Sequence, residues 1–129
     1  MAKRIGKRTI VFENKPHIIG YGSIVGKKEH EGPMSDEFDA FIEDSFFGED
    51  SFEKAESKLQ KNAVETALKR ANLTNNDIDN IFAGDLLNQC IGSSFSLRNT
   101  GLAHLGLYGA CSTMAESLLM ASMAVGGGF

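Results

Sequence analysis

The sequence predicts an α/β fold with a mixed or largely parallel sheet and helices on its faces. Short runs of strand character alternate along the chain with stretches of helical periodicity, and this order is typical of strands joined by crossover helices. One stretch, residues 50–72, carries apolar side chains at steps of three and four. No internal repeat or low-complexity tract interrupts the pattern.

The predicted strands are rich in β-branched and aromatic residues, which favour pleated structure. They cover residues 9–12, 78–83 and 102–108, and a further extended stretch covers residues 18–25. Gly20 and Gly22 interrupt that stretch, which indicates a bulge or a close approach of another backbone.

The helical stretches differ in how much apolar surface they carry. Residues 50–72 have one apolar face, and the capping-box spacing of Asp50 and Glu53 indicates where this helix begins. Shorter helices are predicted over residues 35–47 and from residue 93 or 94 to about residue 101. The last helix, residues 112–125, is apolar on nearly all sides, so we expect it to be buried on all sides.

Composition argues against several classes of function. The formal charge is −4, from 17 acidic and 13 basic residues, whereas nucleic-acid-binding surfaces are usually basic, so we expect no nucleic-acid partner. The basic residues within positions 3–8 are typical of a solvated tail, with a lipid or partner contact as the alternative. Two cysteines and three scattered histidines show no metal-ligand spacing. The chain contains no apolar run of the roughly 18 residues that a membrane-spanning helix needs.

A cysteine stands at the junction between a predicted strand and the last predicted helix. The strand ends near Gly109, and Cys111, Ser112 and Thr113 follow almost at once. A strand–nucleophile–helix junction exposes a reactive side chain above a sheet, and a helix N-terminus favours a thiolate. Cysteine is also among the residues most often buried for packing, so the spacing alone leaves both interpretations open.

Polar residues also follow the preceding predicted strand. Asp85 and Asn88 come directly after the run 78–83. In an open parallel sheet, ligands bind beyond the carboxyl ends of the strands. If the two strands are parallel neighbours, Asp85 and Cys111 could face one crevice. The alternative is that Asp85 begins a turn which Asn88 caps.

Several motifs together resemble a known family. The sequence ALKRANL at 67–73, followed by DID at 77–79 before a strand, is similar to the thiolase and ketoacyl-synthase superfamily. In that superfamily a cysteine nucleophile begins a central helix, as Cys111 does here. The finer resemblance is to the stage V sporulation protein AD family. The matching segments are TIVFE at 9–13, EGP at 31–33, AGDLLNQ at 83–89 and GACSTMAES at 109–117.

The resemblance implies a thiolase-like fold and a role in sporulation. Members bind dipicolinic acid or its calcium chelate, assist its uptake into the developing spore, and act again in germination. Carried over to this sequence, the pocket would draw on Asp85, Asn88 and Cys111. If the ligand lies there, Ser112 and Thr113 at the helix start offer donors for its carboxylates. Asp85 would then orient backbone groups or meet the calcium ion of the chelate.

The resemblance also implies where the protein acts and with what. It places the chain in a spore-forming bacterium, peripheral to the spore inner membrane and otherwise cytoplasmic. Its partners would be other proteins of the stage V sporulation A operon. We expect no cofactor and no metal ion held by the chain itself.

Thiolase-fold proteins consist of two similar halves, and this sequence resembles the first. We therefore expect residues 1–129 to form a truncated N-terminal half of a thiolase-like domain. The His and Asn partners of the cysteine lie in the second half of related synthases, so we do not expect an enzyme here. Without the second sheet, the apolar helix 112–125 would favour association into a homo-oligomer.

Two alternatives to a binding protein stay open. The first is an acyltransferase that uses Cys111 as its nucleophile, although His17, His30 and His104 have no recognisable catalytic context. The second is a structural subunit of a spore membrane complex, whose surfaces matter more than its pocket.

Overall fold

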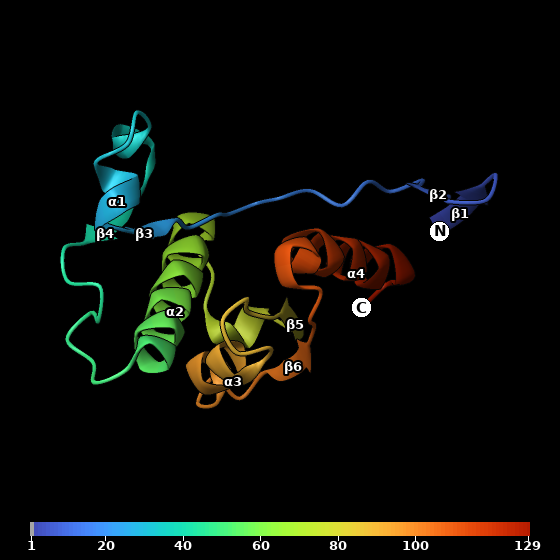
Figure 1. Cartoon of the computed structure of the whole chain (residues 1–129). Helices are drawn as coiled ribbons and strands as arrows, with labels where there is room; N and C mark the ends of the chain where they lie inside the picture. Colours follow the sequence, from blue (N-terminus) through green and yellow to red (C-terminus); the bar gives the residue numbers. More distant parts are fainter. Residues whose placement is uncertain (1) are drawn as a thin grey trace.

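The computed structural model describes residues 2–129 as helices and small sheets in an α/β arrangement (Figure 1). The strands are β1 (Ala2–Ile5), β2 (Thr9–Phe12), β3 (Ile24–Gly26), β4 (Ala40–Ile42), β5 (Asn80–Ala83) and β6 (Ala103–Gly106). Within residues 2–129, β1 pairs with β2 antiparallel, while β3 pairs with β4 and β5 with β6 in parallel. The α/β class predicted from the sequence is therefore confirmed, with both strand senses present.

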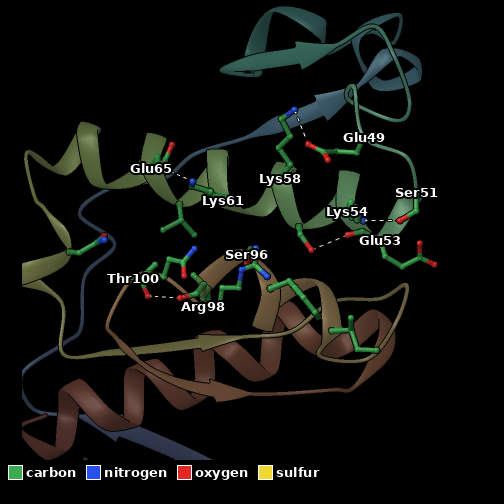
Figure 2. Close-up of a pocket in the computed structure, with 17 residues that line it drawn as sticks. Glu49, Ser51, Glu53, Lys54, Lys58, Lys61, Glu65, Ser96, Arg98 and Thr100 are labelled. Atoms are coloured by element: carbon green, nitrogen blue, oxygen red, sulfur yellow. Dashed lines mark hydrogen bonds and ion pairs between the residues drawn. The ribbon is translucent and has the colours of Figure 1, made fainter.

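The helices connect and cover these strands. They are α1 (Lys27–His30), α2 (Phe52–Ala71), α3 (Ile91–Leu97) and α4 (Thr113–Gly127), with 3₁₀ turns at Ser35–Glu37, Asn75–Asp77 and Ala110–Ser112. Between β5 and β6, α3 contacts both α2 and β6, while α4 packs against β5. Figure 2 shows the two strands lying between α3 on one side and α4 on the other. The long helix and the helix after the cysteine thus lie on opposite sides of the strands.

The long helix α2 agrees with the sequence prediction in all but its cap. Ser51 Oγ accepts a hydrogen bond from the backbone N–H of Lys54 at 3.3 Å, so Ser51 is the N-cap and the prediction of Asp50 is wrong by one residue. The Asp50 side chain instead pairs with Lys54, Oδ1 to Nζ, at 2.7 Å. The helix ends at Asn72, which adopts the left-handed conformation at φ 56°.

An extended segment crosses α2 where the two backbones almost touch. A Cβ atom on Gly20 would lie 2.5 Å from the carbonyl oxygen of Ala67, and one on Gly22 would overlap the carbonyl oxygen of Ala63. The segment is also tied to α2 by Arg70, whose guanidinium lies 4.2 Å from the centre of the Tyr21 ring. The close approach predicted from the two glycines is confirmed.

The predicted helix over residues 35–47 is wrong. Ser35–Glu37 form a 3₁₀ turn, and the apolar residues that follow form β4, parallel to β3. Asp39 Oδ2 accepts hydrogen bonds from the backbone N–H of Ser23 at 2.8 Å and from its hydroxyl at 3.1 Å. This contact between distant parts of the chain overrides the helical spacing. The Phe41 ring then stacks on the His30 ring, with 3.5 Å between the ring centres.

Two other boundaries differ from the sequence analysis. The basic start of the chain is not a tail, because residues 2–5 form β1 and pair with β2 through a turn at Gly6, where φ is 63°. Helix α3 begins at Ile91, ahead of the predicted Ser93 or Ser94. The sequence prediction missed both starts. Residues 2–5 show no apolar alternation, and α3 has no side-chain cap before Ile91.

The last helix is not buried on all sides, contrary to the sequence prediction. One side of α4 packs on β5, and its end meets β1 and the ring of Phe12. Leu119 and Val125 are nevertheless 50% and 58% exposed. Among residues 2–129, no second layer covers this side, and the buried apolar side chains are those of Ile42, Ala55 and Leu97.

The contact at Gly22 predicts a sharp contrast between two Gly→Ala substitutions. Gly22→Ala places a methyl group against the Ala63 carbonyl and should lower the free energy of unfolding by about 1–3 kcal/mol. Gly26→Ala is the control, because its φ of −83° suits alanine and no atom lies within 4 Å of the new Cβ. Urea denaturation followed by circular dichroism measures both. Equal effects of the two substitutions would contradict this close contact.

The exposed side of α4 predicts self-association of this chain in solution. Burial of one leucine contributes about 1.5–3 kcal/mol, so Leu119→Glu should shift the chain toward monomer. Met34→Glu is the matched control, because Met34 is 60% exposed in the segment between α1 and the 3₁₀ turn Ser35–Glu37, and α1 lies across α2 from α4 (Figure 1). Sedimentation velocity over a range of concentrations distinguishes the two. A strictly monomeric wild-type chain with a sharp cooperative melt would refute the expectation.

Candidate functional site

The two loops predicted to form a site do follow parallel neighbouring strands. β5 and β6 pair from Asn80 opposite Ala103 to Ala83 opposite Gly106, so both strands end at the same edge. Just beyond them, a Cβ on Gly84 would overlap the carbonyl oxygen of Leu107 and lie 2.8 Å from Cγ2 of Thr113. The first loop and the start of α4 are therefore packed directly together, as the sequence argument required.

The side chain of Asp85 is buried and serves the protein's own backbone. It is 4% exposed, and its Oδ2 accepts hydrogen bonds from the backbone N–H of Ser93 at 2.9 Å and from the Ser93 hydroxyl at 3.2 Å. Oδ1 accepts the backbone N–H of Asn88 at 3.1 Å. Asp85 thus closes its own loop and fastens it to α3, which is the orienting role that the sequence analysis considered.

The remainder of this loop is equally constrained. The backbone N–H of Asp85 donates to the carbonyl of Gln89 at 2.9 Å, and Gln89 itself adopts a left-handed φ of 62°. Cys90 is half-buried, and its thiol donates to the carbonyl of Leu107 at 3.4 Å. Asn88 is also half-buried, and its backbone N–H donates to Asp85.

Cys111 lies at a tight turn between β6 and α4, as predicted. It is exposed, and it sits in the 3₁₀ turn Ala110–Ser112 that leads into the helix. The residue before it, Ala110, has a φ of 51°, a left-handed conformation that is unfavourable for a side chain with Cβ. A strained residue beside an exposed thiol is the geometry expected of a functional turn.

The hydroxyls of Ser112 and Thr113 are already engaged within the chain. Thr113 is buried, and its Oγ1 accepts the backbone N–H of Gly109 at 3.1 Å. Ser112 Oγ lies 2.8 Å from the carbonyl of Gly109 and 2.6 Å from Oε1 of Glu116. The Glu116 carboxylate therefore stands close to the first turn of α4, where an anionic ligand was expected.

The five predicted residues lie around one edge of the strands but face different ways. Cys111 and Ser112 are exposed to solvent, whereas Asp85 points into the contact with α3, and Thr113 is buried against the first loop. Within residues 2–129, no group of three or more His, Cys, Asp or Glu side chains is placed to hold a metal ion. In the same range, we find no helix of the length and apolar character needed to span a membrane.

A cavity that the sequence analysis missed lies between α2 and α3 (Figure 2). Its volume is about 760 Å³, and none of the five predicted residues lines it. Three lysines from α2 border it, and each has an acidic partner: Lys54 with Asp50, Lys58 with Glu49 and Lys61 with Glu65. Their ion pairs neutralise most of the charge in the cavity.

Comparison with known sequences identifies the family. The sequence profile of the family described as Stage V sporulation protein AD (SpoVAD) matches residues 6–129. The chain belongs to the stage V sporulation protein AD family. Stage V sporulation protein AD of Bacillus subtilis (strain 168) is 40% identical over 127 residues, which are 98% of this chain and 38% of that relative. The chain thus spans well under half the length of the relative.

Membership of the stage V sporulation protein AD family confirms the finer of the two resemblances found in the sequence. It assigns the chain to a sporulation protein and indicates a spore-forming bacterium as its source. Both loops of the candidate site, residues 84–90 and 109–113, lie inside the matched range.

The buried position of Asp85 leads to a prediction about stability. Asp85→Ala leaves the buried N–H of Ser93 and the part-buried N–H of Asn88 without an acceptor, and it should lower the free energy of unfolding by about 1.5–3 kcal/mol. Asp79→Ala removes the same group from an exposed position nearby and should change it by about 0.5 kcal/mol or less. Urea denaturation of both variants is the measurement. A harmless Asp85→Ala would show that the carboxylate does not hold the loop.

Proposed function

We propose that this chain is part of a protein that binds dipicolinic acid, or its calcium chelate, and assists its uptake into the developing spore and its release in germination. The observation that carries the proposal is membership of the stage V sporulation protein AD family over residues 6–129. The geometry supports a ligand site at the edge where β5 and β6 end, because polar groups from two loops are packed together there.

The contacts suggest separate tasks for the residues of this site. Asp85 and Thr113 are buried and hydrogen-bonded to backbone, so they would shape the loops instead of touching the ligand. Cys111 and Ser112 are exposed and would form one wall of the slot, with the Asn88 side chain opposite. Dipicolinate is a planar dianion, so the backbone N–H groups at the start of α4 are suitable donors once Glu116 moves aside.

The fold of the complete protein and its setting are part of the same proposal. The order β5, α3, β6, α4 with a cysteine before the last helix suits the first half of a thiolase-like domain, to which we assign residues 1–129. The exposed side of α4 would then lie against the second half or a second copy of the chain. We place the protein at the periphery of the spore inner membrane, with products of the same operon as partners.

One observation favours a second candidate, an acyltransferase that uses Cys111 as its nucleophile. The thiol is exposed directly after the left-handed Ala110 at the start of a helix. Against this, the Glu116 carboxylate at this turn is hydrogen-bonded to Ser112, and within residues 2–129 the structure gives no hydrogen bond between the Cys111 thiol and a base. The binding protein is therefore the leading proposal.

Calorimetric titration of dipicolinate, with and without calcium, tests the proposal on this chain and on a full-length family member. Asp85→Arg should abolish binding, because it breaks the hydrogen bonds that shape the first loop. Cys111→Ala should weaken binding by removing one wall of the slot. Cys90→Ala is the control for loss of a thiol, since Cys90 faces Leu107 inside the loop.

The outcomes separate the candidates. Circular dichroism must show that each variant is folded before a loss of binding is assigned to the site. Unchanged affinity in both Asp85→Arg and Cys111→Ala would place the ligand elsewhere. An acyl adduct on Cys111 by mass spectrometry, after incubation with an acyl thioester, would favour the acyltransferase instead.

A further inference from the structure

A carboxylate oxygen of α2 is buried without a partner. Glu56 lies on the side of α2 that faces α3 and the loop after β5, and its Oε2 is shielded from solvent. Among residues 2–129, this is the one buried side-chain oxygen or nitrogen that makes no hydrogen bond. A buried, ionised oxygen without a donor is costly, so the protonation state of Glu56 matters for this contact.

Glu56 faces Asp85 across a glycine. A Cβ on Gly92 would lie 3.0 Å from Oε2 of Glu56 and 3.3 Å from Oδ2 of Asp85, so both carboxyl groups border the same small space. The Asp85 oxygens already accept hydrogen bonds from Ser93 and Asn88. Both carboxylate oxygens of Asp85 therefore have hydrogen-bond donors, whereas Oε2 of Glu56 has no donor.

The surroundings of Glu56 disfavour its negative charge. Burial raises the pKa of Glu56 above its ordinary value of 4.5, and the negative charges of Asp85 and, more weakly, Glu53 raise it further. The backbone N–H of Leu87 acts in the opposite direction but does not cancel these effects.

No cation compensates this charge in the packed elements. Helix α3 has no ionisable side chain. In the loop of residues 84–90, which precedes it, the titratable groups are Asp85 and Cys90. Lys54, Lys58 and Lys61 of α2 are paired with Asp50, Glu49 and Glu65. The other two cations of this helix, Lys69 and Arg70, lie in its last turn, away from Glu56, and Arg70 is paired with Asp39.

We propose that the folded protein favours the neutral form of Glu56 over the charged form, and that the neutral carboxyl lets α2 pack against Gly92 and the loop that Asp85 closes. When Glu56 loses this proton, two carboxylates face each other across Gly92, and the packing of α2 against the loop weakens. Glu56 is thus a positioning residue for the loop that carries Asp85 and Asn88. The inference stands on the contacts of the chain itself and does not require that dipicolinate be the ligand.

The sign of the pH dependence follows from the direction of the shift. The folded state holds the Glu56 proton more tightly than the unfolded state, so the stabilisation is fully present below the ordinary pKa of 4.5 and is lost as the pH rises through the raised value. Carboxylates whose pKa is lowered in the folded chain, such as Asp39 and Asp77, contribute the opposite slope. The test must therefore compare variants, because the wild-type profile sums both.

Glu56→Gln keeps the shape of the side chain, removes the titration and provides an amide that can donate toward Asp85. We expect its denaturation midpoint in urea to exceed that of the wild type by a margin that grows as the pH rises from about 4.5 through the raised pKa of Glu56. Glu65→Gln is the matched control, since Glu65 is on the same helix with a side chain that is 61% exposed. Its margin over the wild type should not grow with pH. A constant margin for Glu56→Gln, or equal behaviour of the two variants, would overturn the proposal.

Carboxyl chemical shifts give a readout that does not depend on unfolding. In the chain labelled with ¹³C at Glu carboxyls, the Glu56 signal should titrate above the ordinary glutamate pKa of 4.5. Asp85→Asn removes the facing charge, so it should move the Glu56 titration down toward that ordinary value. A wild-type Glu56 signal that titrates at or below 4.5 would overturn the proposal. Neither readout involves a ligand, so failure here and failure of dipicolinate binding are distinguishable.

Discussion

The packing of Gly84 against the residues after β6 is the constraint on which the candidate site depends. At this point the end of β5 meets the carbonyl of Leu107 and the side chain of Thr113 so closely that no Cβ fits. The contact fixes the first loop against the start of α4, and the parallel pairing of β5 with β6 brings both loops to one edge. A side chain at position 84 would push these loops apart and separate Asp85 and Asn88 from Cys111.

Within that frame, the polar residues divide into those that build the site and those that a ligand can reach. Asp85 and Thr113 use their oxygens on backbone N–H groups, and Glu56 adds a second carboxyl behind Asp85. Cys111 and Ser112 remain at the surface. In this arrangement Asp85 can matter for a ligand through the geometry of the first loop without contacting that ligand.

The elements that the sequence predicted correctly are those whose signal is local. The apolar periodicity of residues 52–71 specifies α2, and the strand, turn and cysteine of residues 103–113 specify the turn before α4. Residues 40–42 could not be predicted, because Phe38, Phe41 and Ile42 fit a helix equally well, and the deciding hydrogen bonds come from Ser23. The direction of Asp85 was likewise hidden, since it depends on the N–H of Ser93, eight residues further along the chain. The exposure of α4 could not be predicted, because it depends on whether other elements pack on the helix, and a local sequence pattern does not contain that information.

The unequal placement of the two cysteines has a practical consequence. Cys111 is at the surface of the turn, whereas the thiol of Cys90 is half-buried and donates to Leu107. A maleimide dye should therefore couple to Cys111 in preference to Cys90 without any engineered residue. A fluorophore at that position would sit at the mouth of the proposed slot, where its emission reports changes in local polarity as small molecules arrive and leave.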